Sequence, residues 1–361
     1  MSIELTNAEE LLSKGEREKA LRIISRVENA IWRYFFRGDY EKGIEILLQC
    51  KKLYEKIGRK LNIANNLSYL SSFYSQKGEK NEGLKYAKKS LELYEQLNDQ
   101  AGIAKSYSLL AYNYGFNVNG NLELAIEYAK RSLSIKEIDP MTKAENLKNL
   151  AIIYGTQGRL NEALQFAEEG YILAQEKKID YLSALCSELI GATYRLQGDL
   201  KRALEYLENG LTHARNSGFV ELIGWALYSL TLTHLDLDSY EQAQEYLKQF
   251  EEAAKKTKDK TTFKMYLMAK GLMLKASGRS RDRAEAENLF KQIVADEITN
   301  PQVFLNAVST LCEILLEELE MSNNKEIISE LEPLITKLLS FAEKTHSFMY
   351  TCLTKGFQAK L

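Results

Sequence analysis

The chain has 361 residues, of which 45% are apolar and 27% charged, and its net charge is −2. This balance leaves no overall basic excess, so we expect neither nucleic acid nor an anionic membrane as a partner. Met1–Lys19 is polar and no apolar run approaches the length of about 18 residues that a membrane span needs, which predicts a cytoplasmic protein without a signal peptide.

Residue usage predicts a helical protein in a reducing compartment. Three prolines in the whole chain are far fewer than usual, as expected where most of the backbone is helix. The cysteines lie far apart, each in an apolar helical stripe, so we expect small buried side chains rather than disulfides or metal ligands. They are Cys50, Cys186, Cys312 and Cys352.

Residues 1–57 predict one or more degenerate repeats that cap the N-terminal end. The interval from Gly15 to Gly38 is little more than half of the period that follows. We therefore expect one shortened helix here, with Ile31, Trp32, Tyr34 and Phe35 packed as a compact cap.

Residues 58–299 predict a regular array of about six helical hairpins. Turn residues recur at intervals of about 40 residues, a length typical of helical repeats, and a small residue follows five positions after most of them. An aromatic residue four positions before the turn recurs as Tyr74, Tyr114, Tyr154 and Tyr194, and is replaced by His234 in the next repeat. The recurring turn residues are Gly38, Gly78, Gly120, Gly158, Gly198, Asp238 and Gly278.

The segment Leu147–Leu173 shows the unit most clearly. Leu147, Leu150, Ala151 and Tyr154 share one helical face before the turn, and small residues such as Ala163 follow it. This pattern resembles the tetratricopeptide repeat family, in a long form of about 40 residues, over residues 30–295. The resemblance implies an all-α, right-handed superhelical solenoid of antiparallel helix hairpins. Long-repeat relatives such as kinesin light chains, spindle-orientation adaptors and bacterial sensor solenoids mostly bind protein segments rather than catalyse.

Two stretches depart from the regular pattern. The inner turn Gly115–Gly120 has a two-residue insertion carrying Phe116 and Val118, which either folds back on the core or contacts a ligand. The stretch Arg279–Arg283 lengthens another inner turn; a solvated turn is favoured there over a phosphate site.

Residues 300–361 predict divergent helices that include an incomplete further repeat. Asn300-Pro301 begins one helix, and another begins near Asn324, interrupted or kinked near Pro333. The final segment, 348–361, has the pattern of a first hairpin helix without its second. Either this helix is the cap, or the natural chain continues beyond it.

No motif in the sequence predicts an enzyme, a cofactor or a metal site. The three histidines have no carboxylate or cysteine at metal-ligand spacing, and no nucleophile elbow or phosphate-binding glycine loop occurs.

The family resemblance assigns partner contacts to the first helix of each hairpin, which lines the concave groove. The residues facing that groove change from polar to apolar along the chain. The apolar half either binds a partner or is covered by the final helices or a further C-terminal segment. The predicted groove residues are Asn65, Ser68, Ser72, Gln76, Tyr112, Lys148, Arg195, Trp225, Tyr228, Leu232, Met265 and Met268.

The sequence thus predicts a non-enzymatic scaffold or adaptor that binds a protein or peptide segment in its groove. The alternative is a peptide- or protein-sensing module of a larger regulatory protein whose effector domain is absent from this chain. The sequence gives no oligomeric state and no identity for the partner.

Overall fold

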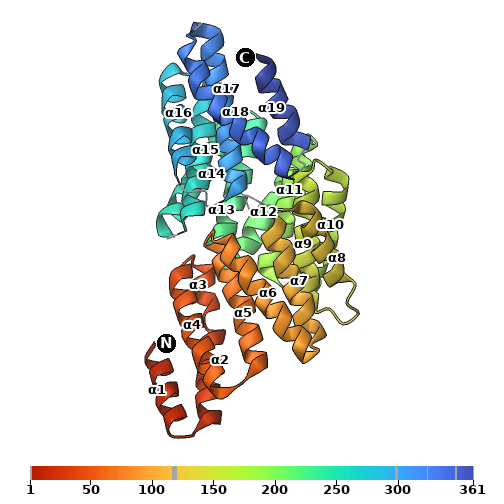
Figure 1. The fold of residues 1–361 in the computed structure, drawn as a ribbon. Coiled ribbons are helices and arrows are strands. Elements are labelled where there is room, and N and C mark those ends of the chain that lie inside the picture. Colours follow the sequence, from red (N-terminus) through yellow and green to blue (C-terminus); the bar gives the residue numbers. More distant parts are fainter. Residues whose placement is uncertain are drawn as a thin grey trace. The chain divides into compact units, whose positions relative to one another are not determined.

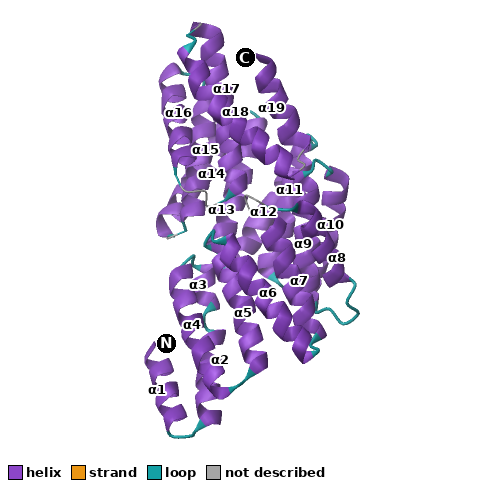
Figure 2. Ribbon diagram, in the orientation of Figure 1, coloured by secondary structure: helices purple, strands orange, loops and turns teal. Residues whose placement is uncertain are grey.

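The computed structural model describes residues 2–115, 120–257, 259–296, 300–322, 324–345 and 348–360. Throughout these ranges the regular structure is α-helical (Figure 2). Contacts between helices divide the chain into two compact units. The N-terminal unit comprises Met1–Asn117 with Glu123–Asn149, and the C-terminal unit comprises Val118–Leu122 with Leu150–Leu361.

In the N-terminal unit each helix packs mainly against its neighbours in the chain (Figure 1). First helices of successive hairpins also touch, as α5 does α7, so the hairpins stack. The helices are α1 (Ser2–Ser13), α2 (Arg17–Asn29), α3 (Trp32–Phe36), α4 (Tyr40–Ile57), α5 (Lys60–Gln76), α6 (Lys80–Leu97), α7 (Gln100–Gly115), α8 (Leu122–Leu133) and the first part of α9 (Pro140–Thr156).

The C-terminal unit repeats this arrangement, with α11 touching α13 and α13 touching α15. Its last helices continue the stack, because α17 packs on α16, α18 on α17 and α19 on α18. After the end of α9 its helices are α10 (Leu160–Glu176), α11 (Asp180–Leu196), α12 (Leu200–Ser217), α13 (Val220–Asp236), α14 (Tyr240–Lys256), α15 (Lys260–Ala276), α16 (Ser280–Ala295), α17 (Pro301–Ser322), α18 (Glu326–Thr345) and α19 (Phe348–Lys360).

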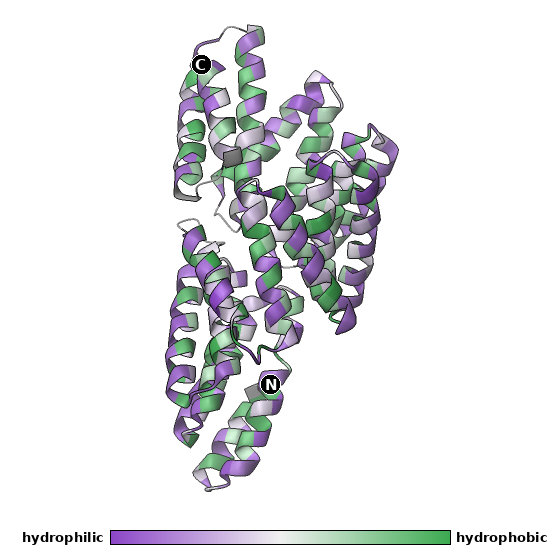
Figure 3. Cartoon of the chain, turned by 90° about the vertical axis from the view of Figure 1, so that its right-hand side faces the viewer, coloured by the Kyte–Doolittle hydropathy of each residue, from purple (hydrophilic) through white to green (hydrophobic). Residues whose placement is uncertain are grey.

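Amphipathic helices account for this packing. Apolar and polar residues alternate around most helices, so each presents an apolar stripe to its neighbours (Figure 3). Small residues let the paired backbones approach: a Cβ atom at Gly43 would overlap the ring of Phe73, and one at Gly83 would overlap the side chain of Ser75. The all-α hairpin architecture predicted from the sequence is confirmed.

Four of the recurring turn residues end the first helix of their hairpin in the same way. Gly78, Gly158 and Gly198 have φ values of 95°, 78° and 82°, and Asp238 adopts φ 53°. The backbone N–H of the following residue donates to the carbonyl of the recurring aromatic residue, as Asp199 does to Tyr194 over 2.9 Å. In the next repeat Ser239 donates to the carbonyl of His234 over 2.8 Å. This is a Schellman end, which needs a left-handed residue and therefore favours glycine. The predicted turns are confirmed at these positions.

The recurring aromatic residues stack on a second aromatic series that the sequence analysis missed. Three of the first-helix tyrosines, Tyr74, Tyr114 and Tyr154, lie nearly parallel to a ring in the following helix, with centroids 5.2 Å apart for Tyr74 and Tyr86 and 5.4 Å apart for Tyr154 and Phe166. The Tyr194 and Tyr206 rings are tilted by 30°. His234 stacks on Tyr246 at 5.3 Å. The second series recurs with the same period as the turns, which was a readable signal. Its members are Tyr86, Tyr128, Phe166, Tyr206 and Tyr246.

The N-terminal end contains the expected shortened helix. Helix α3 has five residues, and Ile31 and Phe35 beside it are buried. The Trp32 ring lies 5.4 Å from that of Tyr69 and 6.0 Å from that of Phe73. Before α3, the helices α1 and α2 form a hairpin of their own.

Three other expectations are corrected. Helix α16 begins at Ser280, so Arg279–Arg283 does not lengthen the turn; Arg283 instead pairs with Glu317 of α17 at 3.0 Å. Helix α18 continues through Pro333 without interruption. Cys352 is exposed, whereas Cys50, Cys186 and Cys312 are buried as expected. The insertion residues Phe116 and Val118 lie outside the described residues.

Candidate partner-binding surface

The predicted polar residues of α5 divide between the surface and the helix packing. Asn65, Ser72 and Gln76 are half-buried, and Asn65 accepts a hydrogen bond from the Tyr94 hydroxyl over 2.5 Å. Ser68 is fully buried, and its hydroxyl lies 2.7 Å from that of Ser90 on α6. The structure therefore places Ser68 in the core between α5 and α6, where it cannot reach a partner.

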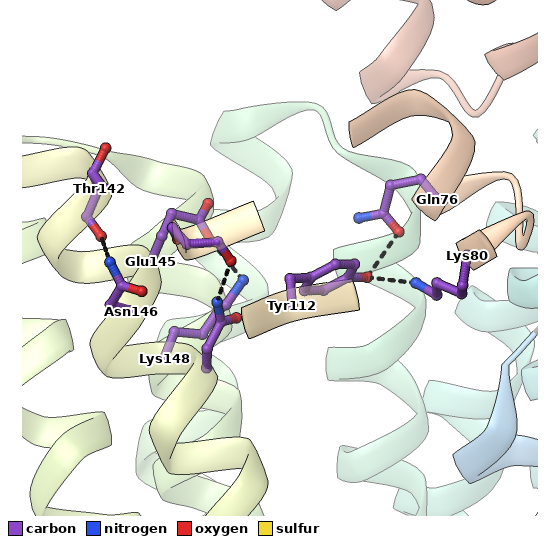
Figure 4. Close-up of polar contacts among 9 residues, drawn as sticks. Gln76, Lys80, Tyr112, Thr142, Glu145, Asn146 and Lys148 are labelled. Atoms are coloured by element: carbon purple, nitrogen blue, oxygen red, sulfur yellow. Dashed lines mark hydrogen bonds and ion pairs between the residues drawn. The ribbon is translucent and has the colours of Figure 1, made fainter. Parts of the chain in front are cut away.

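Tyr112 of α7 is the centre of a polar contact group on the N-terminal unit (Figure 4). The Lys80 ammonium donates to the Tyr112 hydroxyl over 3.2 Å and lies 4.3 Å from the ring centroid. The hydroxyl in turn donates to Gln76 over 3.3 Å. On the other side, the Lys148 ammonium lies 5.3 Å from the ring and pairs with Glu145 at 2.6 Å.

Lys105 makes a similar contact on the preceding turns of α7. Its ammonium lies 4.4 Å over the ring of Tyr69, and burial lowers the pKa of this lysine. Asp139 and Glu28 oppose that shift electrostatically, but neither forms an ion pair with it in the part of the chain that the structure describes. We call the whole set the lysine–tyrosine face: Tyr69, Gln76, Lys80, Lys105, Tyr112, Glu145 and Lys148.

Glu28, beneath this face, is held by neutral donors. Its carboxylate accepts from the Tyr54 hydroxyl over 2.9 Å and from the Asn66 amide over 2.7 Å. Burial raises the pKa of Glu28 despite these hydrogen bonds. This carboxyl group is therefore hydrogen-bonded within the core and forms no ion pair with Lys105.

In the C-terminal unit the predicted residues lie at the edge of the core or within it. Arg195 pairs with Asp236 at 2.7 Å and stays partly exposed. Trp225 and Leu232 are half-buried and pack against the core, and the Trp225 ring lies edge-on to Tyr228 at 6.2 Å. Arg195, Trp225 and Leu232 thus keep some exposed surface.

Met265 and Met268 are core residues, which corrects their assignment to the groove. Their exposed fractions are 0% and 2%, and they belong to one apolar cluster with Val308 and Leu311 of α17. Tyr228 is 8% exposed and belongs to the same apolar cluster. The final helices cover these positions, which was the alternative that the sequence left open.

The sequence analysis missed a polar cluster inside the C-terminal unit. The Gln302 amide donates to the Tyr350 hydroxyl over 2.7 Å, and that hydroxyl donates to Asn306 over 3.2 Å. Glu188 of α11 accepts from Ser229 over 2.8 Å, and burial raises the pKa of Glu188 to about 7 against the opposing effect of Arg195. The signal was two amides, one helical turn apart, on the otherwise apolar face of α17.

The described residues contain no group of three or more histidine, cysteine, aspartate and glutamate side chains that could hold a metal ion. His213 contacts Asp180 at 2.8 Å, and His234 is stacked in a hairpin. Across the helices that the structure describes, none combines the length and apolarity of a membrane span.

Residues 147–177 match the family model of the tetratricopeptide repeat. The fold is that of a tetratricopeptide repeat array. The match falls on the segment in which the sequence shows the hairpin most clearly. None of the curated proteins matches the chain by sequence.

Several solved structures share this repeat fold. A Rap protein complexed with competence and sporulation factor is 16% identical, with a TM-score of 0.59 over 95% of this chain and 98% of that one. Aspartyl phosphate phosphatase F from Bacillus subtilis is 13% identical, with a TM-score of 0.59 over 92% of each chain. The apo quorum sensor NprR from B. thuringiensis is 16% identical, with a TM-score of 0.52 over 99% and 98%. At these identities the likeness establishes the fold alone.

Proposed function

We propose that this chain is a non-enzymatic scaffold that binds a segment of a partner protein along the first helices of its hairpins. The observation that carries the proposal is the lysine–tyrosine face. There Tyr112 and Gln76 stay partly exposed, and cationic groups lie on two of its aromatic rings. Tyrosine offers a partner large contact area at a low entropic cost, and is enriched among residues that dominate binding energy.

The proposed contacts are the predicted groove residues that keep exposed surface. In the N-terminal unit they are Asn65, Ser72, Gln76 and Tyr112, whereas Lys148 is only 6% exposed and pairs with Glu145. In the C-terminal unit they are Arg195, Trp225 and Leu232. Ser68, Tyr228, Met265 and Met268 are excluded, because their side chains are packed inside the units.

The second candidate is a sensing module of a larger regulatory protein. One similar structure holds competence and sporulation factor and another is a quorum sensor, so arrays of this fold serve in regulators. The two candidates share one binding surface. They differ in whether occupancy changes the activity of a further domain.

The test is site-specific photo-cross-linking in an extract of the native cell. A benzoylphenylalanine would replace Tyr112 in one protein and the exposed Lys89 of α6 in a matched control. We expect defined proteins to be cross-linked from position 112 only, and unlabelled parent chain to compete for them. Circular dichroism would establish that both labelled proteins fold. Identical products from both positions, or none from position 112, would contradict the proposal.

A further inference from the structure

Lys105 is a partly buried cation of the N-terminal unit for which burial lowers the pKa. Its side chain is half-buried against the Tyr69 ring, and the described residues offer it neither a hydrogen-bond acceptor nor an ion-pair partner. The two nearest carboxylates are occupied: Glu28 accepts from Tyr54 and Asn66, and Asp139 accepts from the backbone N–H of Thr142 over 3.0 Å. A partly desolvated ammonium of this kind lowers stability unless an anion binds it.

A second cationic place lies further along α7. Lys80 and Lys148 approach the Tyr112 ring from two sides, at 4.3 Å and 5.3 Å, and Glu145 pairs with Lys148. The lysine–tyrosine face therefore holds three lysines and one glutamate, which makes it cationic. Aromatic rings beneath the ammonium groups hold them in place without neutralising them.

The distance between the Lys105 site and the Tyr112 site limits which kind of anion can bind both. Lys105 and Tyr112 are separated by two turns of one helix, or about 10 Å along its axis. One carboxylate cannot reach both. A polyproline II chain rises about 3.1 Å per residue with three residues per turn, so acidic side chains three residues apart on such a chain share one face and can occupy both places.

We propose, resting on the proposed function, that the bound partner segment is acidic, with one internal carboxylate at Lys105 and Tyr69 and another at Lys80 and Tyr112. Charge complementarity selects this occupant from other protein segments. Glu145 at the border disfavours a uniform row of phosphates, and side-chain carboxylates fit two separate places better than a single chain terminus does. When the segment binds, its carboxylate forms an ion pair with Lys105 and offsets the cost of burying the ammonium group.

Fluorescence anisotropy with the full-length chain would test this inference. The probe is a short fluorescein-labelled oligoglutamate whose C-terminus is amidated, so that only side-chain carboxylates are present. Oligoglutamine of the same length and oligothymidylate are the comparison probes. The variants are Lys105→Met, which keeps the apolar stem, and Lys130→Met, an equal change of charge at an exposed site on α8.

We expect oligoglutamate to bind the parent, and Lys105→Met to weaken binding about tenfold, which corresponds to the loss of one charge-assisted contact. Lys130→Met should bind as the parent does. Lys105→Met should also raise the thermal midpoint, because it removes a partly buried, unpaired charge. A residue that only maintained the fold would not combine higher stability with weaker binding.

Several outcomes would overturn the inference: no oligoglutamate binding, equal binding of oligoglutamine, tighter binding of oligothymidylate, or equal losses in both variants. Other outcomes distinguish a failure of this inference from a failure of the proposed function. If photo-cross-links from position 112 identify a partner segment without acidic residues, the scaffold proposal stands and the acidic partner does not. If oligoglutamate binds but no protein is cross-linked, the face recognises acidic chains and the scaffold proposal fails.

Discussion

The interiors of the two units are built differently. In the N-terminal unit, hydroxyl groups of three helices meet in the core: Ser90 lies 2.7 Å from Ser68 and 3.0 Å from Ser106. In the C-terminal unit, the corresponding space is filled by a large apolar cluster that includes Met265, Met268 and side chains of α17 to α19. One repeat architecture thus accommodates a hydrogen-bonded core and an apolar core.

This difference accounts for which of the predicted groove residues keep exposed surface. Small hydroxyl residues pack between α5, α6 and α7, and Tyr112, on another face of α7, keeps some exposed surface. In the C-terminal unit, long apolar residues on the first helices are covered by the chain's own last helices.

The largest effect should come from the apolar core. Met268→Ala should lower the free energy of unfolding by about 2 to 5 kcal/mol, because it leaves a cavity beneath α17. Urea denaturation followed by circular dichroism would measure the change. Met321→Ala is the control, since Met321 is 71% exposed and its truncation should change stability by less than about 0.5 kcal/mol. Equal effects would mean that Met268 is a surface residue after all.

The second effect concerns pH. Glu188 titrates at a pKa of about 7 in the folded chain and near 4.5 when unfolded, so the folded state holds its proton to higher pH. Stability should therefore fall by about 1 to 3 kcal/mol between pH 4.5 and pH 7 through this one group. Glu188→Gln should remove this part of the decline, and Glu169→Gln, which changes a residue on α10, should not. A Glu188→Gln profile parallel to that of the parent would refute the assignment.

A smaller effect is expected in the hydroxyl core. Ser90→Ala removes the hydroxyl that links Ser68 to Ser106, and should cost about 1 to 2 kcal/mol because both neighbours lose a buried partner. Ser134→Ala is the control, since that exposed hydroxyl bonds only locally, to the carbonyl of Arg131. Hydrogen exchange of α5 and α7 would localise the loss. If Ser90→Ala is neutral, tight packing rather than hydrogen bonding holds this core together.

The repeat architecture was predictable because its chemical requirements recur in the sequence. A left-handed turn needs glycine, or at Asp238 a short polar residue, and close helix contact needs small residues such as Gly83. Both requirements therefore place a characteristic residue once in each repeat. The aromatic pairs were equally readable, but only the first member of each pair was recognised.

The binding surface was harder to predict, because one helix face meets different neighbours along the chain. Helical spacing placed Ser68, in the first regular hairpin, in the groove, yet its side chain packs against Ser90 of α6. The exposure of Met268 depends on α17, one hairpin further along the chain, where the regular repeat pattern has ended. Periodicity specifies local packing, whereas exposure depends on helices that the pattern does not describe.

The hydroxyl core of the N-terminal unit has a consequence for temperature. Burial of apolar surface makes the heat capacity of unfolding large and positive, and burial of polar groups reduces it. The Ser68, Ser90 and Ser106 core therefore contributes a flatter stability curve than the Met265 and Met268 core does. Cooling weakens the apolar core first. The face that we propose for partner binding thus lies beside a core whose contribution to stability changes less with temperature.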